Sequence, residues 1–168
     1  MSQANTTVTQ MFSESVSLGD DLPVLQHKVT AKDVVSGAAA SRDWQPLHHD
    51  YPHAVERAGT GNIIMNTSTQ QGWVSRYATD WAGPAARFFA ISIKMKSSLC
   101  PGDELSFSGK INQVSALADG LAMVNLAIIM SVGDRVATEA AVSVILPGKN
   151  SRSSVWDCAG ESLREYAL

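Results

Sequence analysis

The sequence has little cysteine, little charge and no long apolar run, and each shortage excludes a class of protein. The two cysteines are too few for a disulfide framework and form no CxxC pair, which fits a reducing cytoplasm. Charged residues make up 17% of the chain, the net charge is -3, and no basic run points to nucleic acid. The longest apolar stretch, 121–132, contains two polar residues and is too short to span a bilayer.

The termini also lack the features of targeting segments. Residues 1–10 are polar and uncharged, unlike a basic and then apolar signal peptide. We therefore expect a cytoplasmic protein that does not enter the membrane. The length of 168 residues predicts one domain, which we place at 18–150 between a flexible N-terminal arm, 1–17, and a C-terminal surface tail, 151–168.

The first half of the chain has helical patterns. Thr30 and Asp33 resemble a capping box that opens an alanine-rich helix ending near Ser41. A short helix is expected over 51–58, before two glycines. Helical spacing of apolar residues then predicts one long helix over 62–81.

The second half changes to a twofold pattern that is typical of strands. Besides an early extended run, 24–29, apolar and polar residues alternate or cluster in segments separated by turns. We expect strands at 89–95, 105–111, 121–132 and 136–146. One long helix against a mainly antiparallel sheet predicts an α+β fold.

The segment 40–50, Ala-Ser-Arg-Asp-Trp-Gln-Pro-Leu-His-His-Asp, carries the most specific motif. It resembles the Ser-Gly-Asp-x-Asn-Pro-aliphatic-His signature of MaoC-like and (R)-specific enoyl-CoA hydratases. Asp43 and His48 match in identity and spacing, as do the Pro-Leu between them, whereas Arg42 replaces the glycine and Gln45 the asparagine. Further turns bring the likeness to about residues 18–147, and it implies a single hotdog domain, a long central helix wrapped by the sheet.

The resemblance implies a hydro-lyase that adds or removes water at the α,β-position of an acyl-CoA thioester. Such chemistry needs a base for the water, an acid for the α-carbon, and donors for the thioester oxygen. Asp43 and His48, five residues apart on a proline-stiffened loop, are the expected acid/base pair, with their individual roles left open. Coenzyme A enters as part of the substrate, and no metal or other cofactor is expected.

Further site residues follow from the helix that we expect after the motif. The N-terminus of a helix offers unpaired amides to an anion, so Gly61, which matches a family glycine, and its neighbour Asn62 are the expected oxyanion donors. Thr69 aligns best with a family serine on this helix, and Asn66 lies on the same side one turn earlier. Arg42 is a candidate contact for a coenzyme A phosphate.

Rival interpretations remain open. A hotdog acyl-CoA thioesterase would hydrolyse the same thioester, and a non-catalytic acyl-binding subunit of a hetero-oligomeric dehydratase would leave catalysis to a related chain. The histidines at 48, 49 and 53 invite a metal site, which the intervening Pro52 and the missing HExxH pattern disfavour. We expect a homodimer or higher homo-oligomer, or a hetero-oligomer with a related hotdog chain. The acyl group, from fatty acid or steroid metabolism, stays open.

Overall fold

The computed structural model describes residues 9–158, 163–164 and 166–168. Within these ranges, α1 spans Ala31–Ala40 and α2 spans Thr67–Ala82. Single turns of 3-10 helix lie at Ser13–Ser15, Pro46–His48 and Ala118–Gly120, and a π-helix lies at His53–Arg57. The capping box of α1 is confirmed, with Thr30 and Asp33 bonding to each other's backbone N–H groups.

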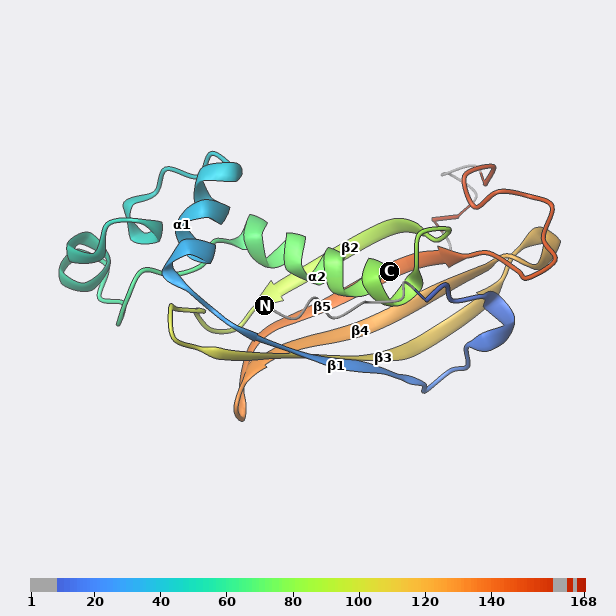
Figure 1. Ribbon diagram of the computed structural model, residues 1–168, viewed down its shortest axis with the longest axis horizontal. Helices are drawn as coiled ribbons and strands as arrows, with labels where there is room; N and C mark the ends of the chain where they lie inside the picture. Colours follow the sequence, from blue (N-terminus) through green and yellow to red (C-terminus); the bar gives the residue numbers. More distant parts are fainter. Residues whose placement is uncertain (1–8, 159–162, 165) are drawn as a thin grey trace, which may run out of the picture.

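The strands form one antiparallel sheet of five strands in the order β1-β3-β4-β5-β2. Their bounds are Asp21–Lys28, Arg87–Met95, Glu104–Ala116, Ala122–Val132 and Arg135–Leu146, numbered along the chain. The helix α2 lies across one face of this curved sheet, and α1 projects with the segment after it beyond one end (Figure 1). The α+β class and the hotdog arrangement expected from the sequence are confirmed.

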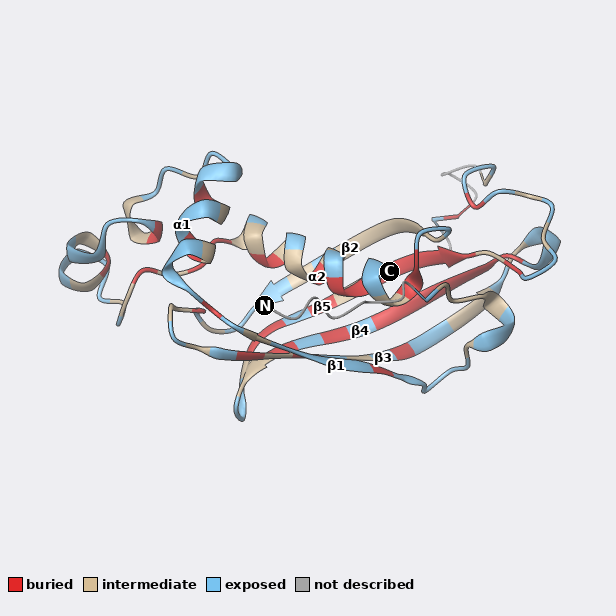
Figure 2. Cartoon of the chain, in the orientation of Figure 1, coloured by how far each residue is buried: buried red, intermediate tan, exposed pale blue. Residues whose placement is uncertain are grey.

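The core lies between α2 and the face of the sheet that it covers (Figure 2). One stripe of α2, with Val74, Tyr77 and Ala78, is buried against alternate residues of β4 such as Leu126 and Ile128. Burial raises the pKa of Tyr77 to about 12. This stripe fixes α2 on the sheet, and therefore fixes where the N-terminus of α2 points.

The long helix begins later than the sequence predicts. Ile63 and Ile64 have helical spacing, but the Ile64 N–H donates to the Leu47 carbonyl (3.0 Å) and the Met65 N–H to the Leu99 carbonyl (2.8 Å). Asn66 then caps α2 by accepting from the Thr69 N–H. Tertiary hydrogen bonds hold 63–65 extended, so the expected start at residue 62 is wrong by five residues.

The described parts of the two expected tails contact the rest of the chain. Residues 1–8 of the arm lie outside the described residues, but the Met11 N–H donates to Ala82 (3.1 Å) and the Ser13 N–H to Pro147 (2.9 Å). In the C-terminal segment, Val155 and Leu163 are buried with Leu121 and Ile145 in a second core cluster. The described parts of this segment therefore cover a portion of the sheet, at the end opposite α1 (Figure 1).

Candidate functional site

The end of α1 places Asp43. The Arg42 N–H returns to the Ala39 carbonyl and the Asp43 N–H to the Ala38 carbonyl, which turns the chain sharply after the helix. This turn requires a positive φ of 55° at Arg42. A residue with a side chain pays about 1 kcal/mol for that conformation, which explains why a glycine suits this position of the motif. The Arg42 side chain is exposed and makes no contact with Asp43 or His48 in the described residues.

His48 is held on the short 3-10 turn that follows Pro46. It is 7% exposed, and its Nδ1 lies 2.7 Å from the Ile64 carbonyl oxygen. Because a carbonyl oxygen only accepts, Nδ1 carries a hydrogen. The other ring nitrogen, Nε2, lies 3.2 Å from Asp43 Oδ2. The structure thus brings together the two residues that the motif singles out.

The Asp43 carboxylate has two further donors. The Asn66 amide donates to Oδ2 at 3.0 Å, and the Gln45 backbone N–H reaches Oδ1 at 3.4 Å. The hydrogen bond from Asn66 is the largest cause that holds the pKa of Asp43 below its usual range, and it outweighs desolvation. The carboxylate and the imidazole nitrogen lie within reach of each other, so the site offers two groups that can take up or release a proton.

Asn66 and Thr69 lie beside this pair. The Thr69 N–H and hydroxyl both donate to Asn66 Oδ1, at 3.0 and 2.5 Å. Thr69 is packed against Gly37 of α1, where any Cβ would overlap its side chain. Thr69 therefore contacts Asn66 and α1, and Asn66 contacts Asp43 directly.

Gly61 and Asn62 do not occupy the place expected of them. Both precede the N-terminus of α2, which begins at Thr67. Gly61 is exposed, and Asn62 Oδ1 accepts its hydrogen bond from the neighbouring Ile63 N–H (2.8 Å). The assignment of these two residues to a helix N-terminus is wrong because the helix starts one and a half turns later.

The amides that do open α2 belong to Thr67 and Ser68, which the sequence reasoning missed. The first N–H groups of a helix have no partner inside it, and Asn66, next in the chain, touches Asp43. The positive end of the helix dipole therefore lies beside the acid/base pair. The asparagine followed by Thr-Ser-Thr is an N-cap pattern that could have located this start.

A cavity of about 230 Å³ is lined in part by Ile64, whose carbonyl oxygen contacts His48. Its lining also includes Met65, Met95 and the buried Gln70, which is bonded to Thr138 (2.5 Å). Trp44, the neighbour of Asp43 in the chain, is 68% exposed.

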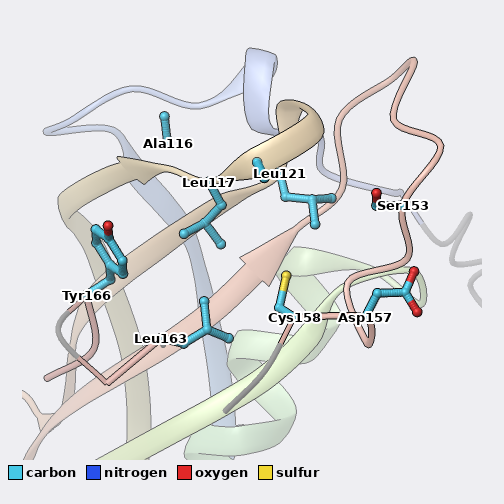
Figure 3. A pocket seen from close by; sticks show the side chains of 9 residues that line it. Ala116, Leu117, Leu121, Ser153, Asp157, Cys158, Leu163 and Tyr166 are labelled. Atoms are coloured by element: carbon cyan, nitrogen blue, oxygen red, sulfur yellow. The ribbon is translucent and has the colours of Figure 1, made fainter. Parts of the chain in front are cut away.

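A second and larger cavity, of about 440 Å³, lies far from the pair under the C-terminal segment (Figure 3). It is lined mainly by apolar side chains, among them Leu117, Leu121 and Leu163. Its described lining also includes the polar residues Asp157 and Ser153, and it includes no histidine. This cavity is the larger of the two, but the described residues that line it include no acid/base pair.

Two further observations concern ligands and membranes. Within residues 9–158 and the described part of the C-terminus, no three His, Cys, Asp or Glu side chains gather in a group that could hold a metal ion. In the same residues, no helix combines the length and the apolar character needed to cross a membrane.

Comparison with known proteins identifies the family of this chain. No family model matches. A beta subunit of 3-oxo-4,17-pregnadiene-20-carboxyl-CoA hydratase from Mycobacterium tuberculosis is 36% identical over 127 residues, which are 76% of this chain and 95% of that protein. The chain belongs to the MaoC-like hydratase family.

Solved structures agree with this family. A chain of the ChsH1–ChsH2 complex from Mycobacterium tuberculosis superimposes with a TM-score of 0.69 at 33% identity, and covers 77% of this chain and 98% of that one. The MaoC-like dehydratase from Rhodospirillum rubrum gives a TM-score of 0.71 at 18% identity, over 83% of this chain and 98% of that one. The second likeness shows the fold that MaoC-like hydratases share.

Proposed function

We propose that this chain is the catalytic chain of a hydro-lyase that adds or removes water at the α,β-position of an acyl-CoA thioester. The observation that carries the proposal is the Nε2–Oδ2 contact of 3.2 Å between His48 and Asp43, beside the N-terminus of α2. Coenzyme A enters as part of the substrate, and the proposed reaction uses no metal or redox cofactor.

The reaction moves two protons and forms one carbon–oxygen bond. The water oxygen bonds to the β-carbon while a water proton passes to the pair, and a proton from the pair passes to the α-carbon. Asp43 and His48 divide these two proton transfers between them, one as the acceptor and the other as the donor. The pair ends with the number of protons it began with, and dehydration is the reverse.

Negative charge develops on the thioester oxygen during this step and needs donors. The Thr67 and Ser68 N–H groups at the start of α2 are our candidates, because they are unpaired within the helix and adjacent to the residue that touches Asp43. They replace Gly61 and Asn62 in that role.

The acyl group is proposed from the relatives. The hydratase of Mycobacterium tuberculosis is named for a pregnadiene carboxyl thioester, so a bulky fused-ring acyl-CoA is our first candidate substrate. The cavity lined by Ile64 and the exposed surface at Trp44 both lie next to residues that contact or adjoin the pair, and they are our candidates for the acyl site. Linear enoyl thioesters are the alternative that the substrate test includes.

The sheet edges favour a partner on one side. The edge strand β1 carries a register shift between Leu22 and Leu25, next to Pro23, which interrupts its outer hydrogen bonds. The opposite edge, β2, is regular from Ala90 to Met95 and bears half-buried Ile91 and Ile93. An unpaired apolar edge of this kind templates another strand. We therefore propose a second hotdog chain on β2, either identical or related, as in the ChsH1–ChsH2 complex.

The direct test is hydration of a panel of enoyl-CoA thioesters, from crotonyl-CoA to 3-oxo-4,17-pregnadiene-20-carboxyl-CoA, followed by loss of the conjugated double bond. Asp43→Asn and His48→Ala are each expected to lose about 10²-fold or more in kcat. His49→Ala and Asp134→Asn, exposed residues of the same types, serve as matched controls and should stay within about twofold.

The outcomes separate the rivals. Free thiol without hydration would assign the chain to the thioesterases. If activity needs a copurified hotdog partner and is lost in Asp43→Asn, this chain is the catalytic one of a hetero-oligomer. If such a complex stays active with both Asp43→Asn and His48→Ala, the chain is a non-catalytic acyl-binding subunit and our proposal fails.

A further inference from the structure

The Asn66 side chain uses every hydrogen-bonding position that an amide has. Its Oδ1 accepts from the N–H and from the hydroxyl of Thr69. Its Nδ2 donates to Asp43 Oδ2 at 3.0 Å and to Ser41 Oγ at 2.8 Å. Asn66 is 3% exposed, so no water replaces a partner that is lost. A flip of the amide would place its oxygen against the Asp43 carboxylate and its NH2 group against the Thr69 N–H, so only the observed orientation satisfies all four neighbours.

The two hydrogen bonds from Thr69 choose that orientation. Thr69 is itself confined, because the absence of a side chain at Gly37 lets α1 approach it closely. The Ser41 hydroxyl donates to the Gly37 carbonyl (2.8 Å) and thereby turns its lone pairs toward Asn66. The chain of contacts runs from α1 through Thr69 and Asn66 to the carboxylate.

A helix cap alone does not explain this arrangement. Capping uses only the Asn66 oxygen that accepts from the Thr69 N–H, and serine or aspartate caps about as well. The two donors of the amide serve no purpose for the helix, and one of them is directed at the carboxylate oxygen that faces His48. Only an amide caps the helix with one end and donates to Asp43 with the other.

We propose that Asn66, oriented by Thr69, is a positioning residue that holds Asp43 Oδ2 against His48 Nε2, and that neither residue contacts the substrate. This inference rests on the proposed function, and it replaces the substrate-binding role that the sequence favoured for both residues. The charged or titratable groups around Asp43 are His48 on the 3-10 turn and Arg42, its neighbour in the chain; α2 contributes only neutral Asn66.

The test compares variants that keep the cap and differ in the donor. Asn66→Ser caps α2 but is too short to reach Asp43, and Asn66→Asp caps it while replacing the donor by an acceptor. Thr69→Val removes one hydrogen bond that orients the amide, and Thr69→Ser keeps it. Asn125→Ser is the matched control, because Asn125 is equally buried, at 3% exposure, and lies on the sheet away from the pair.

Two readouts are measured on the full chain, with its partner if one copurifies. The first is the pH profile of kcat and KM for hydration. The second is the titration of the Asp43 carboxyl carbon by NMR, which needs no activity. For Asn66→Ser we expect a loss in kcat of about tenfold to 100-fold, as for a misplaced catalytic group, with KM within about twofold. The Asp43 titration should move upward, and Thr69→Val should follow with a smaller effect that Thr69→Ser restores.

Three outcomes would overturn the inference. A rise in KM with kcat unchanged would make Asn66 a substrate contact. An unmoved Asp43 titration in both Asn66→Ser and Asn66→Asp would mean that the amide does not act on the carboxylate. Equal losses in Asn125→Ser would mean that general destabilisation is the cause. If wild type hydrates no thioester but the titration moves as expected, the proposed function fails and the positioning network stands.

Discussion

Two asparagines of this protein are equally buried, at 3% exposure each, and both are held by several side-chain hydrogen bonds, yet they lie in regions of different purpose. Asn66, at the start of α2, is bonded to an ionised carboxylate that faces a histidine. Asn125, on β4, donates to Gln113 (3.2 Å) and to the Tyr166 carbonyl (3.0 Å) and accepts from Ser143 (2.7 Å). The first network ends on groups that exchange protons, and the second holds the C-terminal segment on the sheet.

The same contrast holds for the two cavities. The cavity of about 440 Å³ lies in the region of Asn125, and the cavity of about 230 Å³ is lined in part by Ile64, which His48 contacts. The larger one is lined in part by the C-terminal segment, and the described residues of its lining include no acid/base pair. Chemistry in this fold is therefore marked by where a buried polar network ends, and not by how much space lies nearby.

The difference between Asn66 and Asn125 is tested most sharply by making the same substitution at both positions. Asn66→Asp places a second carboxylate beside Asp43, which raises the pKa of Asp43 through like charge, and we expect about 100-fold lower kcat. Asn125→Asp buries a charge among neutral partners and should lower the free energy of unfolding by about 3 kcal/mol with kcat retained.

Steady-state hydration rates measure the expected loss of kcat, and urea unfolding of the same two variants measures the expected loss of stability. Loss of kcat in Asn125→Asp at a temperature where it is fully folded would contradict the division into two regions.

A second prediction concerns the C-terminal segment. Leu163 is buried with Leu121 and Ile145, so Leu163→Ala leaves a cavity. We expect the free energy of unfolding to fall by about 2 kcal/mol, which is at the low end for a core leucine because this second cluster is small. Hydration should be unchanged, because the segment lies at the end of the sheet opposite α1. Thermal unfolding and kcat are measured together, and a Leu163→Val variant should show an intermediate loss.

The pH dependence of stability provides a third, smaller effect. The folded-state pKa of Asp43 is depressed, so its contribution is present above the unfolded pKa, about 3.9, and is lost as pH falls through the folded value. Asn66→Ser removes the main cause of the depression. The stability difference between wild type and Asn66→Ser should therefore shrink as the pH is lowered from about 5 to below the folded pKa. A difference that is independent of pH would show that only packing or capping was lost.

The smallest expected effect is at Arg42. Its φ of 55° suits glycine, so Arg42→Gly should raise the free energy of unfolding by about 0.5 kcal/mol despite the entropy of glycine. The same variant tests the role predicted for the side chain. If Arg42 binds a coenzyme A phosphate, KM for the thioester rises while kcat stays, and KM for a truncated pantetheine thioester does not change.

The sequence predicted well what depends on local pattern. The early extended run and the later alternating or apolar segments predicted a strand near each of the five observed, although β3 continues to Ala116, beyond the expected end at 111. Thr30 and Asp33 located the start of α1. The motif singled out Asp43 and His48, which lie 3.2 Å apart in the structure. These features are encoded by neighbours in the chain.

What the sequence missed depends on contacts between distant residues. Ile63 and Ile64 have a helical pattern, but the N–H groups of Ile64 and Met65 bond to Leu47 and Leu99, and the helix starts only at Thr67. The error moved the expected oxyanion donors to Gly61 and Asn62. The pairing of Asn66 with Asp43 joins residues 23 positions apart, and no local pattern reports such a pair.

The central claim, that Asp43 and His48 add water across the double bond of a thioester, is tested most directly in oxygen-18-labelled water. Wild type is incubated with an enoyl-CoA thioester from the panel, and the products are analysed by mass spectrometry. Our account predicts one labelled oxygen on the β-carbon of an intact thioester, and no such product with Asp43→Asn. Label in a free carboxylic acid, together with released coenzyme A thiol, would contradict it.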